Sequence, residues 1–313
     1  METLAVVLNG PQKLELRRLP LRVPDDGDLV VDIAWSGIST GTERLLWQGR
    51  MPYFPGMGYP LVPGYEAVGR VVAAPRDSAH RIDDAVFVPG AACFGEIKGL
   101  FGAAAARLVV PASRAVSIDS RLGERAVLLA LAATAYHALA APGASRPDLI
   151  VGHGVLGRLL ARLAVSRGGA PPVIWETNAD RMGDPQGYQV RRPEQDERRN
   201  YNCIVDASGD PAILDNLIAR LALGGEIVLA GFYADRLSFA FPPAFMREAR
   251  LRVAAEFRPE DLAAVCRMLQ HGRLSLDGLI THRMSAADAP AAYQTAFDDP
   301  ACLKMILDWR ACA

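Results

Sequence analysis

Three glycines near the middle of the chain have the spacing of a phosphate-binding turn. Gly152, Gly154 and Gly157 follow the short apolar run 149–151, and an apolar stripe with helical spacing comes directly after them. In such a strand–turn–helix, the first glycine permits a tight turn and the second lets the backbone approach a pyrophosphate; the third lets helix and strand pack closely. The free N–H groups at the helix start would bind the phosphates. The turn therefore predicts dinucleotide binding.

A carboxylate lies where the ribose of a dinucleotide would be held. Glu176 ends the apolar run 173–175 and comes 19 residues after Gly157, a position typical of the acid that binds ribose hydroxyls. Such a carboxylate would repel a 2′-phosphate, so the sequence favours NAD as the cofactor over NADP. Arg181 is close enough in sequence to offset this preference.

Further candidate cofactor contacts lie in the turn itself or at the ends of later strands. His153 either touches a phosphate or only tolerates the turn. The other candidates are Val155, Leu156, Ala207, Ser208 and Gly231. Because ligands bind at the carboxyl ends of parallel strands, we expect these residues to lie at one edge of a sheet.

Segment 36–66 is long and irregular, which in a compact domain usually indicates a functional role. Its aromatic and methionine side chains would suit the wall of a wide apolar pocket for a flat macrocycle. The candidates are Trp47, Met51, Tyr53 and Phe54, with Phe232 and Tyr233 facing them from a later segment. The alternative is that these side chains pack beneath their own loops, since most large apolar side chains are core.

The elements that must hold these groups fall into two kinds. Residues 1–118 contain short runs of strand-forming residues separated by Pro, Gly and Asp, which predicts a compact, barrel-like β domain. Residues 119–256 alternate strand and helix patterns, which predicts a parallel sheet. Within this second domain we expect helices at 125–139 and 213–223, the latter capped by Gly224 and Gly225. The tail 257–313 is expected to return to the first domain.

Composition limits the class of protein. A chain of 313 residues with 50% hydrophobic and 22% charged residues is globular and long enough for two domains. The net charge of −1, without a basic block, argues against a nucleic-acid partner. No apolar run reaches the length of a transmembrane segment. Five scattered cysteines without a C-x-x-C indicate a reduced, cytoplasmic protein. The oligomeric state is left open, with a homodimer as one alternative.

With these residues in place, the chain resembles the medium-chain dehydrogenase/reductase superfamily over essentially its whole length. The stretches that carry the resemblance are S-G-I-S-T-G-T-E (36–43), V-P-G-Y-E-A-V-G-R-V (62–71), A-A-T-A-Y-H-A-L (132–139), V-G-H-G-V-L-G (151–157), V-D-A-S-G (205–209) and G-G-E-I-V-L-A-G (224–231). The resemblance implies an α/β fold with a GroES-like β-rich catalytic domain beside a Rossmann domain. It also implies hydride transfer to or from a nicotinamide in the cleft between the two.

The chain departs from the zinc-dependent branch of this superfamily. That branch has a metal-binding cysteine and histidine where this chain has Ser39 and Tyr65, neither of which is a usual zinc ligand. The four cysteines of the structural zinc lobe are also missing, since only Cys93 lies in that region. Glu66 matches a family glutamate near the metal, and one carboxylate does not hold zinc. The resemblance therefore implies a member that binds no metal.

Segments 36–43 and 49–66 look more narrowly like the dehydrogenases of bacteriochlorophyll biosynthesis. This resemblance implies oxidation of the 3-(1-hydroxyethyl) group of a bacteriochlorophyllide to 3-acetyl with NAD. The conjugated macrocycle would spread the positive charge left by hydride departure, and an acid–base group would handle the proton. Tyr65, in the position of a lost metal ligand, would face the reacting oxygen with Ser39 across the pocket.

The candidates for proton transfer are Tyr65, Ser39, Glu43 and Glu66, and each has a structural alternative, above all Glu66 as a buried scaffold residue. Two other functions remain open. One is a zinc-free quinone or enone reductase that uses NADPH. The other is a nucleotide-binding protein that has kept the fold and lost catalysis.

Overall fold

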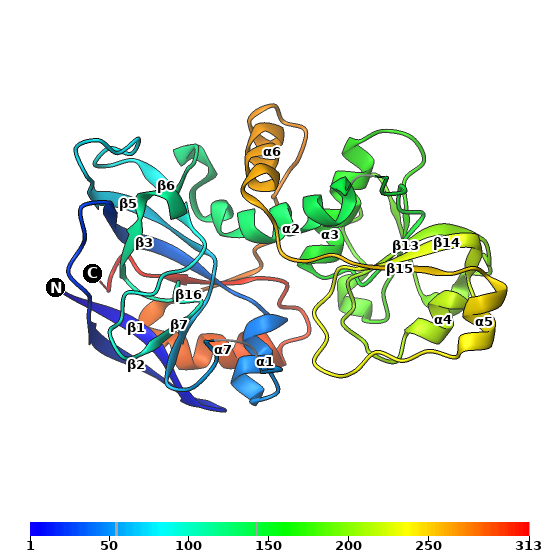
Figure 1. Ribbon diagram of the computed structural model, residues 1–313, viewed down its shortest axis with the longest axis horizontal. Coiled ribbons are helices and arrows are strands. Elements are labelled where there is room, and N and C mark those ends of the chain that lie inside the picture. The colour runs from blue at the N-terminus through cyan, green and yellow to red at the C-terminus, as the bar shows by residue number, and fades with distance from the viewer. Residues whose placement is uncertain (54–55, 142, 313) are drawn as a thin grey trace. The chain divides into compact units, whose positions relative to one another are not determined.

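The computed structural model describes residues 1–53, 56–141 and 143–312 and divides into two compact units (Figure 1). Unit 1 comprises Met1–Ala130 and Asp277–Ala313, and unit 2 comprises Leu131–Leu276. The expected boundaries, after residues 118 and 256, lie earlier in the chain. One reason is that His137 of the first long helix bonds through Nδ1 to Asp261 Oδ2 at 2.8 Å, which ties the helix after residue 258 to unit 2.

Unit 1 is built on two sheets. The smaller has the strand order β2-β1-β4-β7, and the larger has the order β16-β17-β3-β5-β6-β9, with β8 paired to β3. The strands are β1 Glu2–Gly10, β2 Lys13–Pro20, β3 Asp28–Ile38, β4 Leu61–Pro63, β5 Ala67–Ala73, β6 Ala85–Val88, β7 Lys98–Leu100, β8 Arg107–Pro111, β9 Val116–Ser117, β16 His282–Ser285 and β17 Met305–Asp308. Backbone bonds from Val6 N to Ala104 O and from Ala106 N to Leu4 O join the sheets, consistent with the expected barrel-like domain.

The tail supplies both strand and core to unit 1. Strand β17 pairs antiparallel with β3, so that Met305 lies opposite Ile38. The helices of this unit are α1 Thr42–Gln48 and α7 Ala289–Asp298, with 3₁₀ turns at η1 Ala112–Arg114, η2 Ser120–Leu128 and η5 Ala286–Asp288. Tyr293 and Phe297 of α7 are buried in the same apolar core as β1 and β3. The expected return of the tail follows from these buried contacts, because they remove its apolar face from water.

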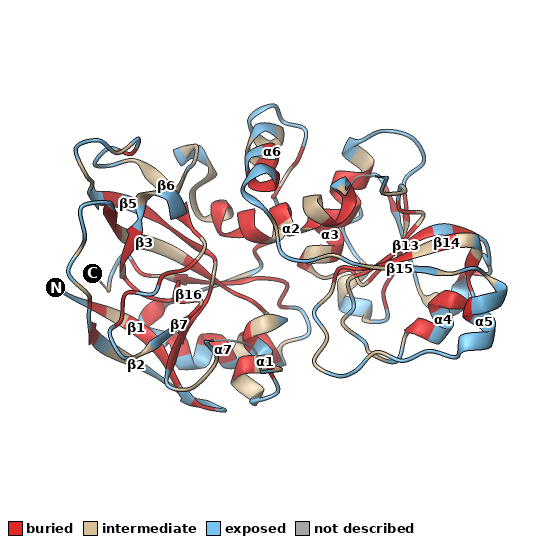
Figure 2. Cartoon of the chain, viewed as in Figure 1, coloured by how far each residue is buried: buried red, intermediate tan, exposed pale blue. Residues whose placement is uncertain are grey.

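Unit 2 is a parallel sheet of six strands in the order β12-β11-β10-β13-β14-β15. This order reverses direction between β10 and β13, which is the position where such sheets bind ligands. The strands are β10 Leu149–Val151, β11 Val173–Trp175, β12 Gln189–Arg191, β13 Tyr201–Asp206, β14 Leu221–Leu229 and β15 Arg250–Val253. The helices are α2 Leu129–Ala140, α3 Val155–Ser166, α4 Leu214–Ile218, α5 Phe241–Met246 and α6 Pro259–Gln270, with short turns η3 Ala179–Arg181 and η4 Pro193–Gln195. Figure 2 shows that α3 is largely buried whereas α5 is mostly exposed.

Two helix predictions in this region need correction. The helix expected at 213–223 ends as α4 at Ile218, and Gly224 and Gly225 lie inside strand β14. The pairing of β13 with β14 shifts register here, because Tyr201 faces Leu221 while Cys203 faces Glu226. Gly224, with φ +71°, provides the left-handed backbone of this bulge. The helix expected from residue 125 is 3₁₀ until Leu128 and becomes α-helical at Leu129.

Candidate active site

Ser39 and Tyr65 are held together by a direct hydrogen bond. Ser39 follows the end of β3, and Tyr65 lies between β4 and β5. The Tyr65 hydroxyl donates to Ser39 Oγ at 2.7 Å. Burial raises the pKa of the Tyr65 phenol above its ordinary value, and the carboxylate of Glu66 adds to the rise, while hydrogen bonding with Ser39 and Thr42 opposes it. At neutral pH the pair is therefore two neutral hydroxyls that can donate or accept a hydrogen bond.

Glu43 lies next to this pair, and the bonds of its carboxylate go to other groups. Its Oε1 accepts the backbone N–H of Ser39 at 2.9 Å, and its Oε2 accepts the hydroxyl of Tyr293 at 2.6 Å. Only 1% of Glu43 is exposed, and burial raises its pKa to about 7 despite these two bonds. With both oxygens engaged, Glu43 is placed to fix the position of Ser39.

Glu66 forms a buried ion pair with a lysine from the far end of the chain. Lys304 Nζ donates to Glu66 Oε2 at 2.7 Å and to Oε1 at 3.0 Å, and neither side chain is more than 1% exposed. Burial raises the pKa of Glu66, and the ammonium of Lys304 opposes that rise. This geometry favours the scaffold role over proton transfer for Glu66.

The expected pocket side chains have divergent surroundings. Trp47 packs against Tyr293 and Phe297, with ring centroids 6.5 and 6.1 Å apart. Met51 is buried in a small cluster with Leu8, Leu46, Leu61 and Leu100. Tyr53 is 85% exposed, and Phe54 lies outside the described residues. Within unit 1 the packing of Trp47 and Met51 thus matches the core alternative.

The glycine turn of unit 2 has the predicted strand–turn–helix context between β10 and α3. Gly152 has φ +94°, and a Cβ on Gly157 would lie 1.8 Å from Gly152 O, so only glycine permits this helix–strand contact. A Cβ on Gly154 would meet no atom within 4 Å. Gly154 also caps α3 without any side-chain bond, and Val155 and Leu156 begin the helix. An open approach to a helix N-terminus fits a pyrophosphate.

Glu176 binds the turn through its backbone. Its Oε2 accepts from His153 N at 2.9 Å, and its Oε1 accepts from Thr177 N and Asn178 N, both at 2.7 Å. Since each carboxylate oxygen has two lone pairs, Oε2 keeps one acceptor position beyond these bonds. Such a position fits a ribose hydroxyl.

The His153 ring faces the protein interior. It is fully buried, with Nδ1 2.6 Å from Arg181 O and Nε2 2.9 Å from the Tyr188 hydroxyl. A carbonyl can only accept, so Nδ1 carries the proton and Nε2 accepts from Tyr188. Burial lowers the pKa of His153 to about 4. Neither nitrogen is left for a phosphate, and the geometry favours the structural alternative for this side chain.

The remaining predicted contacts gather where strands β10, β13 and β14 end. A Cβ on Gly152 would lie 3.2 Å from the Ala207 carbonyl carbon and from Ser208 N, and one on Gly231 would lie 3.1 Å from Gly209 N. Behind them, Asp206 is fully buried and accepts the Tyr233 hydroxyl at 2.5 Å. Tyr233 is thereby fixed to the sheet, whereas Phe232 is 51% exposed.

A family model, two curated relatives and a solved structure all place the chain in one family. Residues 25–120 match the alcohol dehydrogenase GroES-like domain. A Cereibacter sphaeroides protein named 2-desacetyl-2-hydroxyethyl bacteriochlorophyllide A dehydrogenase is 59% identical over 100% of both chains. Its namesake from Rhodobacter capsulatus is 59% identical over 99% of both. L-Idonate 5-dehydrogenase of Escherichia coli superimposes with a TM-score of 0.85 at 18% identity, covering 98% of both chains. The chain belongs to the medium-chain dehydrogenase/reductase superfamily.

Membership in the medium-chain dehydrogenase/reductase superfamily confirms the fold class and the resemblance drawn from the sequence. It makes the protein a dehydrogenase with a nicotinamide cofactor. In the described chain, each helix is too short or too polar to cross a bilayer.

Several residues around the candidate sites were not predicted. Lys304 and Tyr293 reach Glu66 and Glu43 from 238 and 250 residues away, a distance at which no local spacing gives a signal. Arg158 of α3 is buried and donates to His153 O, Arg181 O and Gly183 O. Its position beside Gly157, with Arg162 four residues later on the same face of an otherwise largely apolar helix, was the available signal.

The donor set of unit 1 does not fit the catalytic zinc of this superfamily. Ser39 and Tyr65 bond to each other as neutral hydroxyls, and the ammonium of Lys304 neutralises Glu66. Zinc sites in proteins use Cys, His, Asp or Glu ligands. The described residues include no group of three His, Cys, Asp or Glu side chains that could hold a metal ion. We derive no catalytic step through a metal.

We expect the purified protein to carry no stoichiometric zinc. The physical reason is the replacement of two metal ligands by Ser39 and Tyr65 beside a buried ammonium. Elemental analysis of protein purified without chelator measures this directly. One zinc per chain, together with activity that is lost on chelation and regained with zinc, would contradict the prediction.

Proposed function

We propose that this protein oxidises the 3-(1-hydroxyethyl) group of a bacteriochlorophyllide to 3-acetyl, with NAD and without catalytic zinc, in bacteriochlorophyll biosynthesis. The observation that carries the proposal is full-length identity of 59% to two proteins named for this type of substrate. The absence of fitting zinc ligands supports the metal-free part of the proposal. The NAD preference is supported by Glu176.

NAD, when bound, would supply the acceptor for the hydride of the carbinol carbon. In this proposal the N–H groups at the start of α3 and the free acceptor position on Glu176 Oε2 would hold it in unit 2. A second negative charge at the ribose 2′ position would lie close to this carboxylate and be repelled by it. Arg181 is held in the same turn region through its backbone oxygen.

In this proposal, unit 1 supplies the groups that take the proton from the alcohol. In this proposal the Tyr65 hydroxyl binds the substrate oxygen, and Ser39 Oγ, already 2.7 Å away, accepts or donates within the same chain of hydroxyls. Because the pKa of Tyr65 is raised, the phenol acts as a hydrogen-bonding group that relays the alcohol proton through Ser39 to water, rather than as a preformed tyrosinate. The conjugated macrocycle lowers the barrier on the hydride side.

A turnover assay with the pigment alcohol tests the proposal. With NAD, we expect the pigment absorbance to shift as the acetyl group joins the conjugated system, in step with NADH formation. Turnover of simple quinones with NADPH but not of the pigment would replace the proposal by a quinone reductase. Tight nucleotide binding without turnover of either substrate would indicate a non-catalytic protein.

Replacing Glu176 with Ala should weaken NAD binding by about 1–3 kcal/mol, the range for a lost hydrogen bond to a charged group. The preference for NAD over NADP should narrow as well, because the repelling charge is gone. Calorimetric titration with both nucleotides measures these changes. Glu176→Gln is the matched control: it keeps an acceptor for His153 N but removes the charge, so it should narrow the preference with less loss of NAD affinity. Tighter binding of NADP than NAD by the unchanged protein would overturn the assignment.

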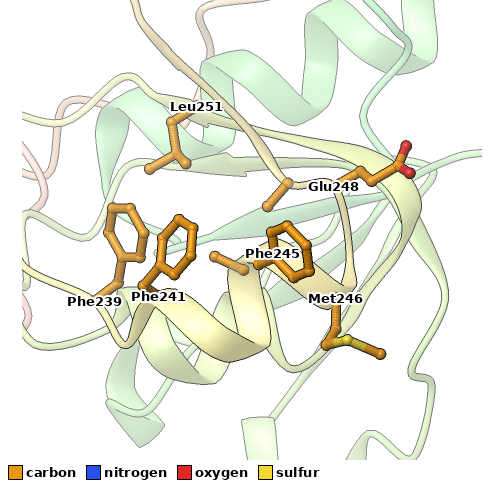
Figure 3. Close-up of a pocket in the computed structure, with 8 residues that line it drawn as sticks. Phe239, Phe241, Phe245, Met246, Glu248 and Leu251 are labelled. Atoms are coloured by element: carbon orange, nitrogen blue, oxygen red, sulfur yellow. The ribbon is translucent and has the colours of Figure 1, made fainter.

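We also propose that the protein is a homodimer joined through the exposed edge of unit 2. Strand β15 is the end of its sheet, and unpaired sheet edges are usually covered. Phe239, Phe241 and Phe245 stand beside Leu251 around a hollow of about 460 Å³ (Figure 3). Val253 is 77% exposed. An apolar patch along an open edge suits a second copy of the same edge.

The charge-introducing variant Val253→Lys should shift the protein toward the monomer in light scattering after gel filtration. A lysine on an edge strand opposes pairing with another edge because it would bring two like charges together. Val72→Lys, at an exposed position on β5 of unit 1, should leave the mass unchanged. A monomeric unchanged protein at micromolar concentration would exclude the dimer.

The five cysteines form no disulfide in the described chain, which supports a reducing, cytoplasmic location.

A further inference from the structure

Lys304 is a buried cation whose partners come from two separate segments of unit 1. It directly precedes strand β17 and is 1% exposed. Its Nζ donates to Ile38 O at 3.2 Å as well as to both oxygens of Glu66. One ammonium therefore joins the end of β3 to the start of β5.

These partners are the sequence neighbours of the hydroxyl pair. Ile38 directly precedes Ser39, and Glu66 directly follows Tyr65. The bond between Tyr65 and Ser39 and the contacts of Lys304 thus span the same two segments side by side. Gly37 makes room for this approach, since a Cβ there would lie 2.1 Å from Glu66 Oε2.

A buried ion pair is a weak source of stability. Removing two charges from water costs free energy that their attraction only partly restores, and apolar or neutral replacement of both partners is often neutral for folding. Removing one partner alone is strongly destabilising because it leaves a buried charge. A Lys–Glu pair at this place is therefore better explained by the geometry it imposes than by the stability it adds.

We propose that Lys304, with Glu66, is a positioning residue that holds Tyr65 and Ser39 at hydrogen-bonding distance. In zinc-dependent members of the superfamily, ligands at the positions of Ser39 and Tyr65 are joined by the metal. Here the ammonium of Lys304 joins the same two segments through Ile38, which precedes Ser39, and Glu66, which follows Tyr65. We call the pair of Lys304 and Glu66 the clamp. The role of Tyr65 in this proposal rests on the proposed function, whereas the clamp rests on the contacts of Lys304.

The experiment uses the double variant Lys304→Met/Glu66→Gln, which leaves no unpaired buried charge. Thermal unfolding establishes that it is folded. We expect kcat for the pigment alcohol to fall by about tenfold or more, within the range for loss of a positioned acid–base group, while the KM for NAD stays unchanged. In a Tyr65→Phe background the same double change should alter kcat by no more than about twofold, because residues that act through one another are not additive.

Two outcomes would overturn the clamp. One is an unchanged kcat in the folded double variant. The other is an equal loss of kcat with and without the Tyr65 hydroxyl, which would mean that the pair supports the whole unit. Lys13→Met, at an exposed position on β2, is the control and should change nothing. If the double variant is unfolded at the assay temperature, Lys304→Met/Glu66→Leu, which likewise leaves no unpaired buried charge, replaces it in the same cycle under the same criteria.

A readout without substrate separates this proposal from the proposed function. In protein labelled with ¹³Cζ-tyrosine, the Tyr65 resonance is assigned by its loss in Tyr65→Phe. We expect this resonance to shift in the double variant, because the phenol loses its bond to Ser39, while the tyrosine signals of unit 2 stay in place. An unshifted Tyr65 resonance would overturn the clamp. A shifted one with no pigment turnover by the unchanged protein would leave the clamp standing and refute the proposed substrate.

Discussion

The Tyr65→Phe variant is expected to lose kcat for the pigment alcohol by about 10²–10⁴-fold, the usual contribution of a positioned acid–base group. The substitution keeps the ring, whose edge packs against Phe101 at a centroid distance of 5.7 Å, and removes only the hydroxyl. NAD affinity should be unchanged, since the proposed cofactor contacts belong to unit 2. Steady-state kinetics with calorimetric titration of NAD measure both quantities.

Tyr136→Phe is the matched control for this loss. Its ring lies beneath the guanidinium of Arg167 at 5.2 Å, and it is in α2, away from the hydroxyl pair in the chain and in the other unit. A near-normal kcat for Tyr65→Phe would mean that Tyr65 has only a packing role and fills the space that the metal takes in zinc-dependent members. Attention would then turn to Glu43, whose pKa of about 7 suits a base at neutral pH.

The strand–turn–helix geometry of the proposed cofactor site was predictable from the sequence because its determinants are local. Gly152 and Gly157 have the expected steric requirements, a positive φ and a close approach to backbone, and Gly154 leaves the helix start open. Glu176 follows the next strand, so parallel pairing of β10 with β11 brings it to the turn. Short spacings and strand ends are sufficient to place these groups without knowledge of the rest of the chain.

The surroundings of the hydroxyl pair were not predictable in the same way. Ser39 and Tyr65 could be placed together only through the family resemblance, and their contact depends on sheet pairings across 26 residues. Lys304 and Tyr293 arrive from the tail, where β17 and α7 pack on unit 1. A single lysine before a strand carries no signal that it will be buried, because lysine is almost never buried without a partner.

At two places the structure depends on contacts that local sequence patterns do not show: the end of α4 and the ring of His153. Residues 221–223 continue the apolar character of α4, but they begin strand β14 instead, ahead of the bulge at Gly224. His153 sits inside the glycine turn, where the sequence left both phosphate contact and a purely structural role open. Its ring instead turns inward to Tyr188 and Arg181 O, an orientation set by side-chain bonding across 28 and 35 residues.

The second large effect is expected from Gly157→Ala. Its new Cβ would lie 1.8 Å from Gly152 O, and this neighbour is backbone that cannot rotate away. Overpacking usually costs about 1–3 kcal/mol and more where backbone must move, whereas the better helix propensity of alanine returns only about 1 kcal/mol. We expect a lower unfolding midpoint and a displaced start of α3. NAD affinity should fall by at least about 100-fold, or about 2.7 kcal/mol.

Gly154→Ala separates the two roles of the glycines. It has open space around its Cβ and an ordinary extended conformation, φ −72° and ψ −170°, so the variant should keep the unfolding midpoint of the unchanged protein. Its methyl group would nevertheless occupy the approach to the helix N-terminus, and NAD binding should weaken. Chemical unfolding and calorimetric titration of both variants give the comparison. If Gly154→Ala binds NAD normally, the pyrophosphate does not approach through this opening. A fully stable Gly157→Ala would show that α3 can move away from β10 without cost.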